Sequence, residues 1–356
     1  MNLNSNMSCT FCYDMPKIEL HAHLNGSLSQ KTLMHLIKNK PHTNVNSAES
    51  VIMKGGQRTM AEGFELFRLI HKLVDSSDDV KFVTKSVISE FYRDNVKYLE
   101  LRSTPKDIKE TSLSKALYIQ SVLQAIKEYQ HENPNHDIDV VYLPSIDRGR
   151  TLEDAAETLK LVNEIHTSGG SIPAIDFSGN PYTLDCDKFL PILNSARNNG
   201  LKLAVHLCEI SDRTNETREL LSVFPDRIGH GTYLMESTEL TETVRSRRTP
   251  IEICLTSNMK TSTCPPDAAK HHIADWYFAK PTEPHPCALC TDDKGVFSTN
   301  LSNEFDILSN AMNMDKNELF NFSRNSIAYA FCDHNNKKHL YQLFDKWMQD
   351  HNNISN

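Results

Sequence analysis

The sequence predicts a single α/β domain built as a (β/α)8 TIM-type barrel. Three observations lead to this fold. Eight apolar segments of strand length recur along the 356 residues, most are separated by segments of helical period, and a polar or glycine residue stands at or just after the C-terminal end of each. Barrel enzymes collect their catalytic groups on that rim. The rim residues are His23, Arg102, Asp147, Gly179, His206, His230, Asn258 and Asp292.

The strands and crossover helices follow from the apolar periodicity of the chain. We expect strands over the run from Ile18 to His23 and then over Val96–Arg102, Ile138–Ile146, Ile172–Phe177, Leu201–Leu207, Arg227–His230, Pro250–Leu255 and Cys287–Thr291. We expect crossover helices near Ser112–Gln130, Leu152–His166, Lys188–Asn198 and Glu216–Ser222, and a helical tail towards Asn356. Gly200 follows the third of these helices, as a glycine commonly does at a helix end.

A long insertion separates the first two strands. Residues 27–95 contain helical patterns near Gln30–Lys38, Met60–Val74 and Val80–Phe91, with a break at Gly55-Gly56. The length of this insertion favours a helical lid over the barrel mouth. We therefore treat residues 1–356 as one domain that carries a lid-like segment.

Composition excludes several classes of protein. A net charge of −8 with scattered Lys and Arg residues argues against binding to a nucleic acid polymer. The chain has no apolar run of bilayer length and no secretory pattern in its first ten residues, so we expect a cytoplasmic monomer without membrane contact. The nine cysteines are an odd number, mostly isolated in apolar segments, which is typical of reduced thiols. Cys287 and Cys290 are expected in the core.

The first strand ends in a His-x-His pair. Residues two apart on a strand share a face, so His21 and His23 point the same way. By the same rule His206 points into the barrel mouth, and Asp292 follows the eighth strand, which adjoins the first in a closed barrel. Three imidazoles and a carboxylate suit one Zn²⁺ per chain with an open position for water, although iron and cobalt remain alternatives. Taken singly, each residue also fits a core histidine or a helix cap, and the polar setting of His271-His272 argues against a second metal pair.

Short motifs in a fixed order make the chain resemble the adenosine and AMP deaminase family. The first is His-x-His-Leu-x-Gly, spelled by His21 to Gly26. The others are Ser178-Gly179, His206-Leu207-Cys208-Glu209, Arg227-Ile228-Gly229-His230-Gly231, Thr256-Ser257-Asn258 and Thr291-Asp292-Asp293. This resemblance covers most of the chain. It implies a zinc-dependent barrel enzyme that hydrolyses an amino group from a purine.

The resemblance also implies roles for individual residues. His21, His23, His206 and Asp292 would be the zinc ligands. Glu209 would be the proton donor, His230 would orient the attacking hydroxide, and Asp293 would bind a purine ring nitrogen. Hydrolysis at carbon 6 needs such a set, because ring nitrogen 1 must be protonated as the nucleophile adds.

The substrate expected from the resemblance is a 6-(alkylamino)purine nucleoside monophosphate. Asn25 stands where enzymes for free adenosine usually carry Asp, and the missing charge suits a 5′-phosphate. Lys294 stands where those enzymes tend to have Pro, whereas Asn180 replaces the usual Asp. These features resemble the adenosine deaminase-like subgroup, which acts on N6-methyl-AMP. The expected substrate contacts are His23, Asn25, His71, Ser103, Thr104, Pro105, Lys106, Asp147, Gly179, Glu209 and Asp293.

Other functions stay open at this stage. The chain could act on free adenosine, with His71 as an ordinary surface histidine of its helix. It could also be a barrel that binds a purine nucleotide without reacting it, although such a protein does not need Glu209 or an open metal site. A deaminase of nucleic acid bases is disfavoured, because the acidic chain offers no groove for a strand.

Overall fold

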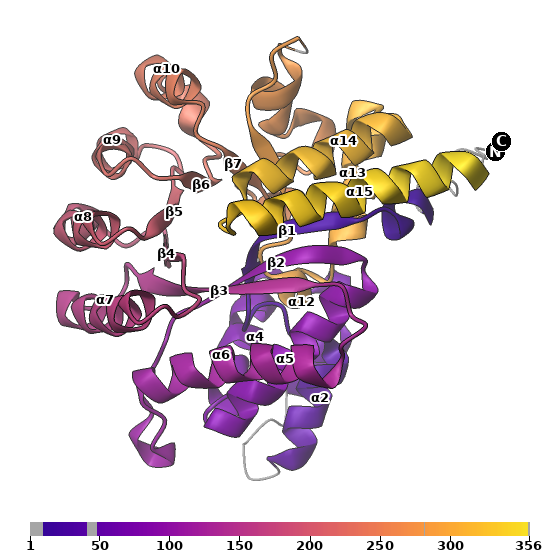
Figure 1. Ribbon diagram of the computed structural model, residues 1–356. Coiled ribbons are helices and arrows are strands. Elements are labelled where there is room, and N and C mark those ends of the chain that lie inside the picture. The colour runs from indigo at the N-terminus through magenta and orange to yellow at the C-terminus, as the bar shows by residue number, and fades with distance from the viewer. Residues whose placement is uncertain (1–9, 41–47, 281, 355–356) are drawn as a thin grey trace.

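The computed structural model describes residues 10–40, 48–280 and 282–354, and within them the chain forms an eight-stranded parallel sheet. Each strand pairs with the next in the chain, in the order β1 to β8 (Figure 1). The strands are β1 (Lys17–His23), β2 (Val96–Ser103), β3 (Asp139–Asp147), β4 (Ala174–Ser178), β5 (Lys202–Leu207), β6 (Arg227–His230), β7 (Ile251–Ile253) and β8 (Cys287–Leu289). The fold expected from the sequence is confirmed.

The sheet closes into a barrel between its last and first strands. The amide of His23 donates to the carbonyl of Asp292 at 3.0 Å, and the amide of Asp292 donates to the carbonyl of His21 at 2.8 Å. An isolated parallel bridge joins Ala22 to Asp292. Residue 292 is therefore held beside the histidine pair by the main chain itself.

Helices follow the strands and cover the outside of the barrel; Figure 1 shows α7, α8, α9 and α10 arranged beside the strands that they follow. The helices after the second strand are α6 (Lys115–Glu132), α7 (Leu152–Thr167), α8 (Leu190–Asn198), α9 (Thr214–Ser222), α10 (Thr238–Arg247), α11 (Leu255–Lys260), α12 (Lys294–Phe297), α13 (Leu301–Met312), α14 (Lys316–Asn325) and α15 (His334–Ile354). Short single turns are η2 (Lys109–Thr111), η3 (Cys186–Phe189), η4 (Leu234–Glu236), η5 (Ala268–Lys270), η7 (Ser326–Tyr329) and the π-helical η6 (Ala274–Phe278).

The insertion after β1 is helical, as expected, except that residues 41–47 lie outside the described structure. It contains α2 (Gln30–Asn39), α3 (Ala48–Met53), η1 (Gly55–Gln57), α4 (Met60–Leu73) and α5 (Ser77–Arg93). Capping boxes begin α4 at Thr59 and α5 at Ser76. Lys294 of α12 donates to Glu90 of α5 at 2.6 Å, which ties the insertion to the end of β8.

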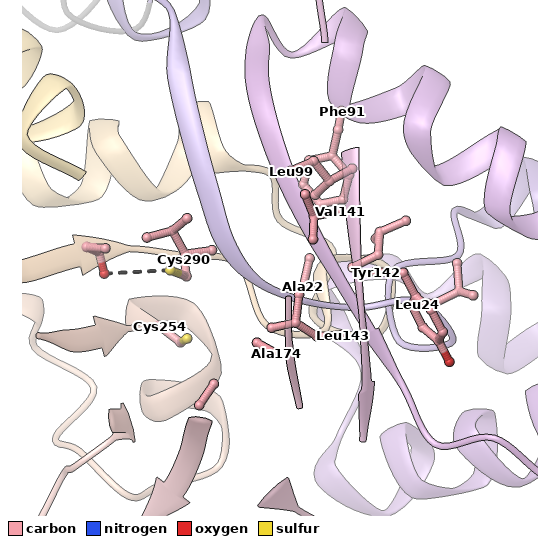
Figure 2. Packing of buried hydrophobic residues seen from close by; sticks show 14 of the residues in the cluster. Ala22, Leu24, Phe91, Leu99, Val141, Tyr142, Leu143, Ala174, Cys254 and Cys290 are labelled. Atoms are coloured by element: carbon pink, nitrogen blue, oxygen red, sulfur yellow. Dashed lines mark hydrogen bonds between the residues drawn. The ribbon is translucent and has the colours of Figure 1, made fainter. Parts of the chain in front are cut away.

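The core is continuous from the barrel wall to the surrounding helices. Figure 2 shows Leu99, Tyr142 and Leu143 of β2 and β3 packed near Ala22 and Leu24, with Phe91 of α5 above them. All of these side chains are buried. Alternate residues of each strand face this shell of helices, which leaves the others to point into the barrel.

The cysteines and the helices bear on two further expectations from the sequence. The cysteines that the structure describes are all free thiols, and Cys287 and Cys290 are buried in the core as expected. Among the described residues, none of the helices combines the length and the apolar character needed to cross a bilayer.

Candidate active site

The two histidines of β1 meet the histidine of β5 at the mouth of the barrel. Nε2 of His21 lies 3.3 Å from Nε2 of His23, which lies 3.3 Å from Nε2 of His206. Oδ1 of Asp292 lies 3.5 Å from His21 Nε2 and 3.4 Å from His23 Nε2. The four residues expected to hold a metal ion are thus brought together from β1, β5 and the end of β8.

The chemistry of these atoms fits a divalent cation. Nδ1 of His21 lies 2.7 Å from Glu252, and Nδ1 of His206 lies 3.1 Å from Asp176. Because an ionised carboxylate only accepts, each Nδ1 carries the hydrogen and each Nε2 turns its lone pair toward the common point. Burial lowers the pKa of His21, but hydrogen bonds to Asp292 and Glu252 outweigh it and raise the pKa to about 9. Burial lowers the pKa of His23 to about 3, so the charged group of the cluster that favours a cation is the carboxylate of Asp292.

A buried ionic network below this cluster fixes its two supporting carboxylates. Arg102 donates to Glu252 at 2.6 Å and to Asp176 at 3.1 Å, and Arg227 donates to Glu252 at 2.6 Å. Despite burial, the charges of Arg102 and Arg227 hold the pKa of Glu252 well below its usual range, and His206 and Arg102 do the same for Asp176. Neither acid was predicted, although charged residues inside apolar strand segments were a visible signal.

Three residues at the strand ends adopt left-handed backbone conformations. Cys208, His230 and Asp292 have φ values of 54°, 61° and 61°. For residues other than glycine this conformation costs about 1–2 kcal/mol, and such residues concentrate at functional sites. Here the sharp turns after β5, β6 and β8 present Glu209, His230 and Asp292 to the same space.

Glu209, His230 and Asp293 line the same cavity as three of the four candidate metal ligands. Nε2 of His230 lies 3.8 Å from Glu209 Oε2 and 3.8 Å from Asp292 Oδ2. One buried carboxylate oxygen of Glu209 and one of Asp293 have no hydrogen-bond partner. Burial raises the pKa of both, and the charge of Asp292 raises that of Asp293 further. Both carboxyl groups are thus disposed to carry a proton.

A cavity of about 1060 Å³ opens above these groups. The insertion contributes Phe67 and His71 of α4 to its wall, and the segment after β8 contributes Asp292 and Asp293, with Val296 and Phe297 from α12. Nine of the residues expected to contact the substrate line it: His23, Asn25, His71, Ser103, Thr104, Asp147, Gly179, Glu209 and Asp293. Gly179 has a φ of 118°, and a Cβ there would lie 2.3 Å from Asp147 Oδ1, so only glycine fits.

Pro105 and Lys106 are the two expected substrate contacts that do not line this cavity among the described residues. The Lys106 ammonium is buried and donates instead to the carbonyls of Val74 at 2.7 Å and His71 at 3.3 Å, at the C-terminal end of α4. The carbonyl of Pro105 accepts from Arg150 at 3.0 Å. Neither residue therefore stands on the cavity wall in this structure, where the end of α4 takes the ammonium of Lys106.

Two charged residues of the cavity wall, Arg58 and Lys260, were not predicted from the sequence. Arg58 donates to the carbonyls of Gly295 at 3.0 Å and Val296 at 2.7 Å. Lys260 of α11 donates to the carbonyls of Gly56 at 3.0 Å and Phe297 at 2.8 Å. Both cations join the insertion to α11 and α12, and no local sequence pattern marks such long-range contacts.

The fold and the site together define a class: a parallel α/β barrel with a candidate mononuclear metal centre and a buried glutamate at the C-terminal ends of its strands. The chain belongs to the adenosine deaminase family. The model of that family, described as adenosine deaminase, matches residues 16–347.

Individual relatives agree with this assignment. The chain is 45% identical over 344 residues to N6-methyl-AMP deaminase of Danio rerio, covering 95% of this chain and 97% of that protein. The apo structure of the N6-methyl-AMP deaminase from Arabidopsis thaliana matches with a TM-score of 0.87 and 38% identity, covering 95% of this chain and 98% of that one. A structure of Arabidopsis ADAL complexed with IMP matches with a TM-score of 0.87 and 38% identity, covering 96% and 99%.

Proposed function

We propose that this chain hydrolyses N6-methyl-AMP to IMP and methylamine and uses one bound zinc ion. The observation that carries the proposal is the convergence of three imidazole Nε2 atoms and Asp292 at the cavity where Glu209 and Asp293 each have one buried carboxyl oxygen without a hydrogen-bond partner. The relatives named N6-methyl-AMP deaminase support the substrate. In this reaction water adds an oxygen to carbon 6, and the bond from carbon 6 to the methylamino nitrogen breaks.

The metal ligands proposed are His21, His23, His206 and Asp292. They present nitrogen and oxygen donors of the kind that zinc prefers, with a side left open toward the cavity. When bound, the ion acts as a Lewis acid and lowers the pKa of water toward neutrality. Glu252 and Asp176 fix the ring orientations of His21 and His206, so the site is organised before an ion arrives.

The side chains around the ion divide the proton chemistry among them. Burial raises the pKa of Glu209, which favours the protonated form; in the proposed reaction Glu209 donates its proton to ring nitrogen 1 and then carries a proton from the attacking water to the departing amine. Asp293 donates to another ring nitrogen and fixes the plane of the purine. His230 holds the attacking oxygen between itself and Asp292 by a hydrogen bond. These roles fit the one buried oxygen of each carboxyl group that has no hydrogen-bond partner within the protein.

Recognition of a 5′-phosphate rests on the end of the cavity near Asn25. Its side chain is uncharged, and its buried Oδ1 has no partner. His71, Ser103 and Thr104 line the same cavity and supply donors. Burial, and after it the charges of Lys106 and Arg150, lower the pKa of His71, while the charge of Asp147 raises it. The two nearby cations and the uncharged Asn25 support a phosphate at this end of the cavity.

The test is a comparison of kcat/KM for N6-methyl-AMP, AMP, N6-methyladenosine and adenosine with zinc-loaded protein. We expect each monophosphate to exceed its nucleoside by roughly 100-fold or more, because charged hydrogen bonds are worth about 1.5–3 kcal/mol each. Asn25→Asp places a negative charge at the phosphate end and is expected to reduce that ratio. Adenosine as the best substrate would overturn the phosphate assignment, and no turnover of any purine would favour a non-catalytic nucleotide-binding barrel.

A further inference from the structure

The pair His271 and His272 lies behind the active site and forms a buried cluster with Cys264. Nε2 of His272 lies 2.9 Å from the carbonyl of His230, and its Nδ1 lies 3.4 Å from Cys264 Sγ. Nδ1 of His271 accepts from the amide of Ile273 at 3.3 Å, and its Nε2 lies 3.1 Å from Asn258 Oδ1. Every ring nitrogen of the pair is therefore already hydrogen-bonded within the protein, which suits a supporting role better than a second metal site.

The position of each hydrogen in this cluster follows from one fixed donor. The amide of Ile273 can only donate, so Nδ1 of His271 accepts and carries no hydrogen. Burial lowers the pKa of His271 well below its usual range, so the ring is neutral and its hydrogen is on Nε2. That hydrogen is donated to Asn258, which must turn Oδ1 toward His271.

The orientation of Asn258 in turn fixes the ring of His230. With Oδ1 facing His271, Nδ2 of Asn258 faces Nδ1 of His230 at 3.3 Å and donates to it. The same Nδ2 lies 3.3 Å from Thr263 Oγ1, whose own hydrogen goes to the carbonyl of Asn258 at 3.2 Å. Both hydrogens of the amide thus have acceptors. Since Nδ1 of His230 accepts, a neutral His230 carries its hydrogen on Nε2.

We propose that His271 is a positioning residue that acts through Asn258 to hold His230 in the tautomer with hydrogen on Nε2. This nitrogen faces the space between Glu209 Oε2 and Asp292 Oδ2, each 3.8 Å away. In the reaction of the proposed function, on which this inference rests, His230 then donates a hydrogen bond to the attacking oxygen and does not take its proton. Glu209 is left as the group that moves protons.

His272 provides a second support for the same residue. Its Nε2 donates to the carbonyl of His230, whose φ of 61° is a strained backbone conformation. A carbonyl can only accept, so Nδ1 of His272 has a free lone pair that receives the thiol hydrogen of Cys264. His271 therefore fixes the tautomer of the His230 ring, and His272 holds the backbone carbonyl of His230 by a hydrogen bond.

The tautomer is measured directly by ¹⁵N NMR of histidine-labelled, zinc-loaded protein. A ring nitrogen that carries hydrogen resonates far from one that does not, and the signals of His230 are assigned by their loss in His230→Gln. We expect the hydrogen of His230 on Nε2 in the unaltered protein and a mixture of tautomers in His271→Leu. In Asn258→Asp, where a carboxylate faces Nδ1, we expect the hydrogen on Nδ1. An unaltered His230 with hydrogen on Nδ1 would refute the proposal.

Kinetics give a second readout with a matched rescue. Loss of a residue that orients a catalytic group typically costs about 10–100-fold in activity, so His271→Leu should lower kcat by this factor with little change in KM. His271→Gln keeps an amide donor near the position of Nε2 and should recover most of kcat. His285→Leu is the control, because His285 is also buried and bonds a carbonyl, that of Thr249, away from the cavity.

The two readouts separate this proposal from the proposed function. If no purine is turned over but the NMR assigns the hydrogen of His230 to Nε2, the positioning role of His271 stands and the proposed function is wrong. If the enzyme is active while His271→Leu leaves both the His230 tautomer and kcat unchanged, the proposed function stands and the positioning role of His271 is wrong. Equal losses in His271→Leu and His271→Gln would likewise show that the imidazole does not act through its donor.

Discussion

At the scale of single residues, the site is determined by which nitrogen or oxygen carries each proton. Glu252 and Asp176 place hydrogens on the Nδ1 atoms of His21 and His206, so that both Nε2 atoms face the metal position. Glu209 has the opposite property, because its buried oxygen has no partner and burial raises its pKa. In the proposed reaction the histidines bind the ion through unprotonated Nε2 atoms and Glu209 starts as the protonated acid, so the two kinds of group are separated within one cavity.

Replacing Glu209 tests this division of roles. Glu209→Gln keeps the size of the side chain but cannot transfer a proton, so we expect metal content to stay at one ion per chain while kcat falls by about 10²–10⁴-fold. His206→Ala should instead lose the metal, because it removes one ligand. Elemental analysis and steady-state kinetics of both variants measure this difference. Near-normal turnover by Glu209→Gln would show that another group donates the proton.

Replacing Asp176 tests a residue that supports the proposed ligand His206, while all four proposed ligands stay in place. In Asp176→Asn the amide no longer provides a charged acceptor for Nδ1 of His206, so we expect zinc affinity to fall by about 10–100-fold. Competition with a chelator measures the dissociation constant without any assay of activity. Asp94→Asn is the matched control, since Asp94 is also buried but bonds Ser302 away from the metal position. Equal affinity in the two variants would argue against a role for Asp176.

At the scale of secondary structure elements, the site depends on how the ends of neighbouring strands fit together. The turn after β1 touches α12 so closely that the amides of Gly295 and Val296 both donate to the carbonyl of Gly26. A Cβ at Gly26 would lie 1.5 Å from Oδ1 of Asp293. Glycine is required at this position because Asp293 occupies the space of a side chain.

Gly26→Ala is expected to displace Asp293 and leave the barrel folded. A shift of about 1 Å in a substrate-binding group can cost about 100-fold in rate, so kcat/KM should fall by that order. Gly169→Ala provides the contrast, because Gly169 has a φ of 80° with nothing within 4 Å of its added Cβ. That variant should lose about 1–2 kcal/mol of unfolding free energy with unchanged kcat/KM. Thermal unfolding and kinetics of both proteins decide between the two effects.

The elements show how far the sequence predicts this fold. Strands such as β2 and β5 were predicted because they are apolar runs bounded by turns, and barrel closure then brings His206 and Asp292 to His21. The short helices α3 and α11 were not predicted, because six residues are too few to show a helical period. The hydrogen-bonded chain from His271 through Asn258 to His230 was also not predicted, because it depends on side chains that meet only in the folded protein.

Lys106 shows a different limit of sequence-based reasoning. A lysine in a polar loop after a strand is a reasonable phosphate ligand when only its charge is considered. In the fold, the C-terminal end of α4 lies close enough for its carbonyls to take the ammonium. The choice between ligand and helix terminus depends on how the insertion packs, which no local pattern records.

At the scale of the whole molecule, the closed barrel converts residues far apart in the chain into one site. The main-chain bonds between residues 21, 23 and 292 fix the metal position, while the insertion and α12 cover the cavity above it. The insertion and α12 are tied together by hydrogen bonds of Lys294, Arg58 and Lys260. The barrel thus carries the candidate metal ligands, and the insertion supplies part of the cavity wall.

The metal position is tested most directly by anomalous X-ray scattering at the zinc edge from crystals of the zinc-loaded protein. We expect one peak, about 2.0–2.2 Å from the Nε2 atoms of His21, His23 and His206 and from a carboxylate oxygen of Asp292. A peak at Cys264, His271 and His272 instead, or no peak beside the β1 histidines, would contradict both the metal centre and the reaction proposed to depend on it.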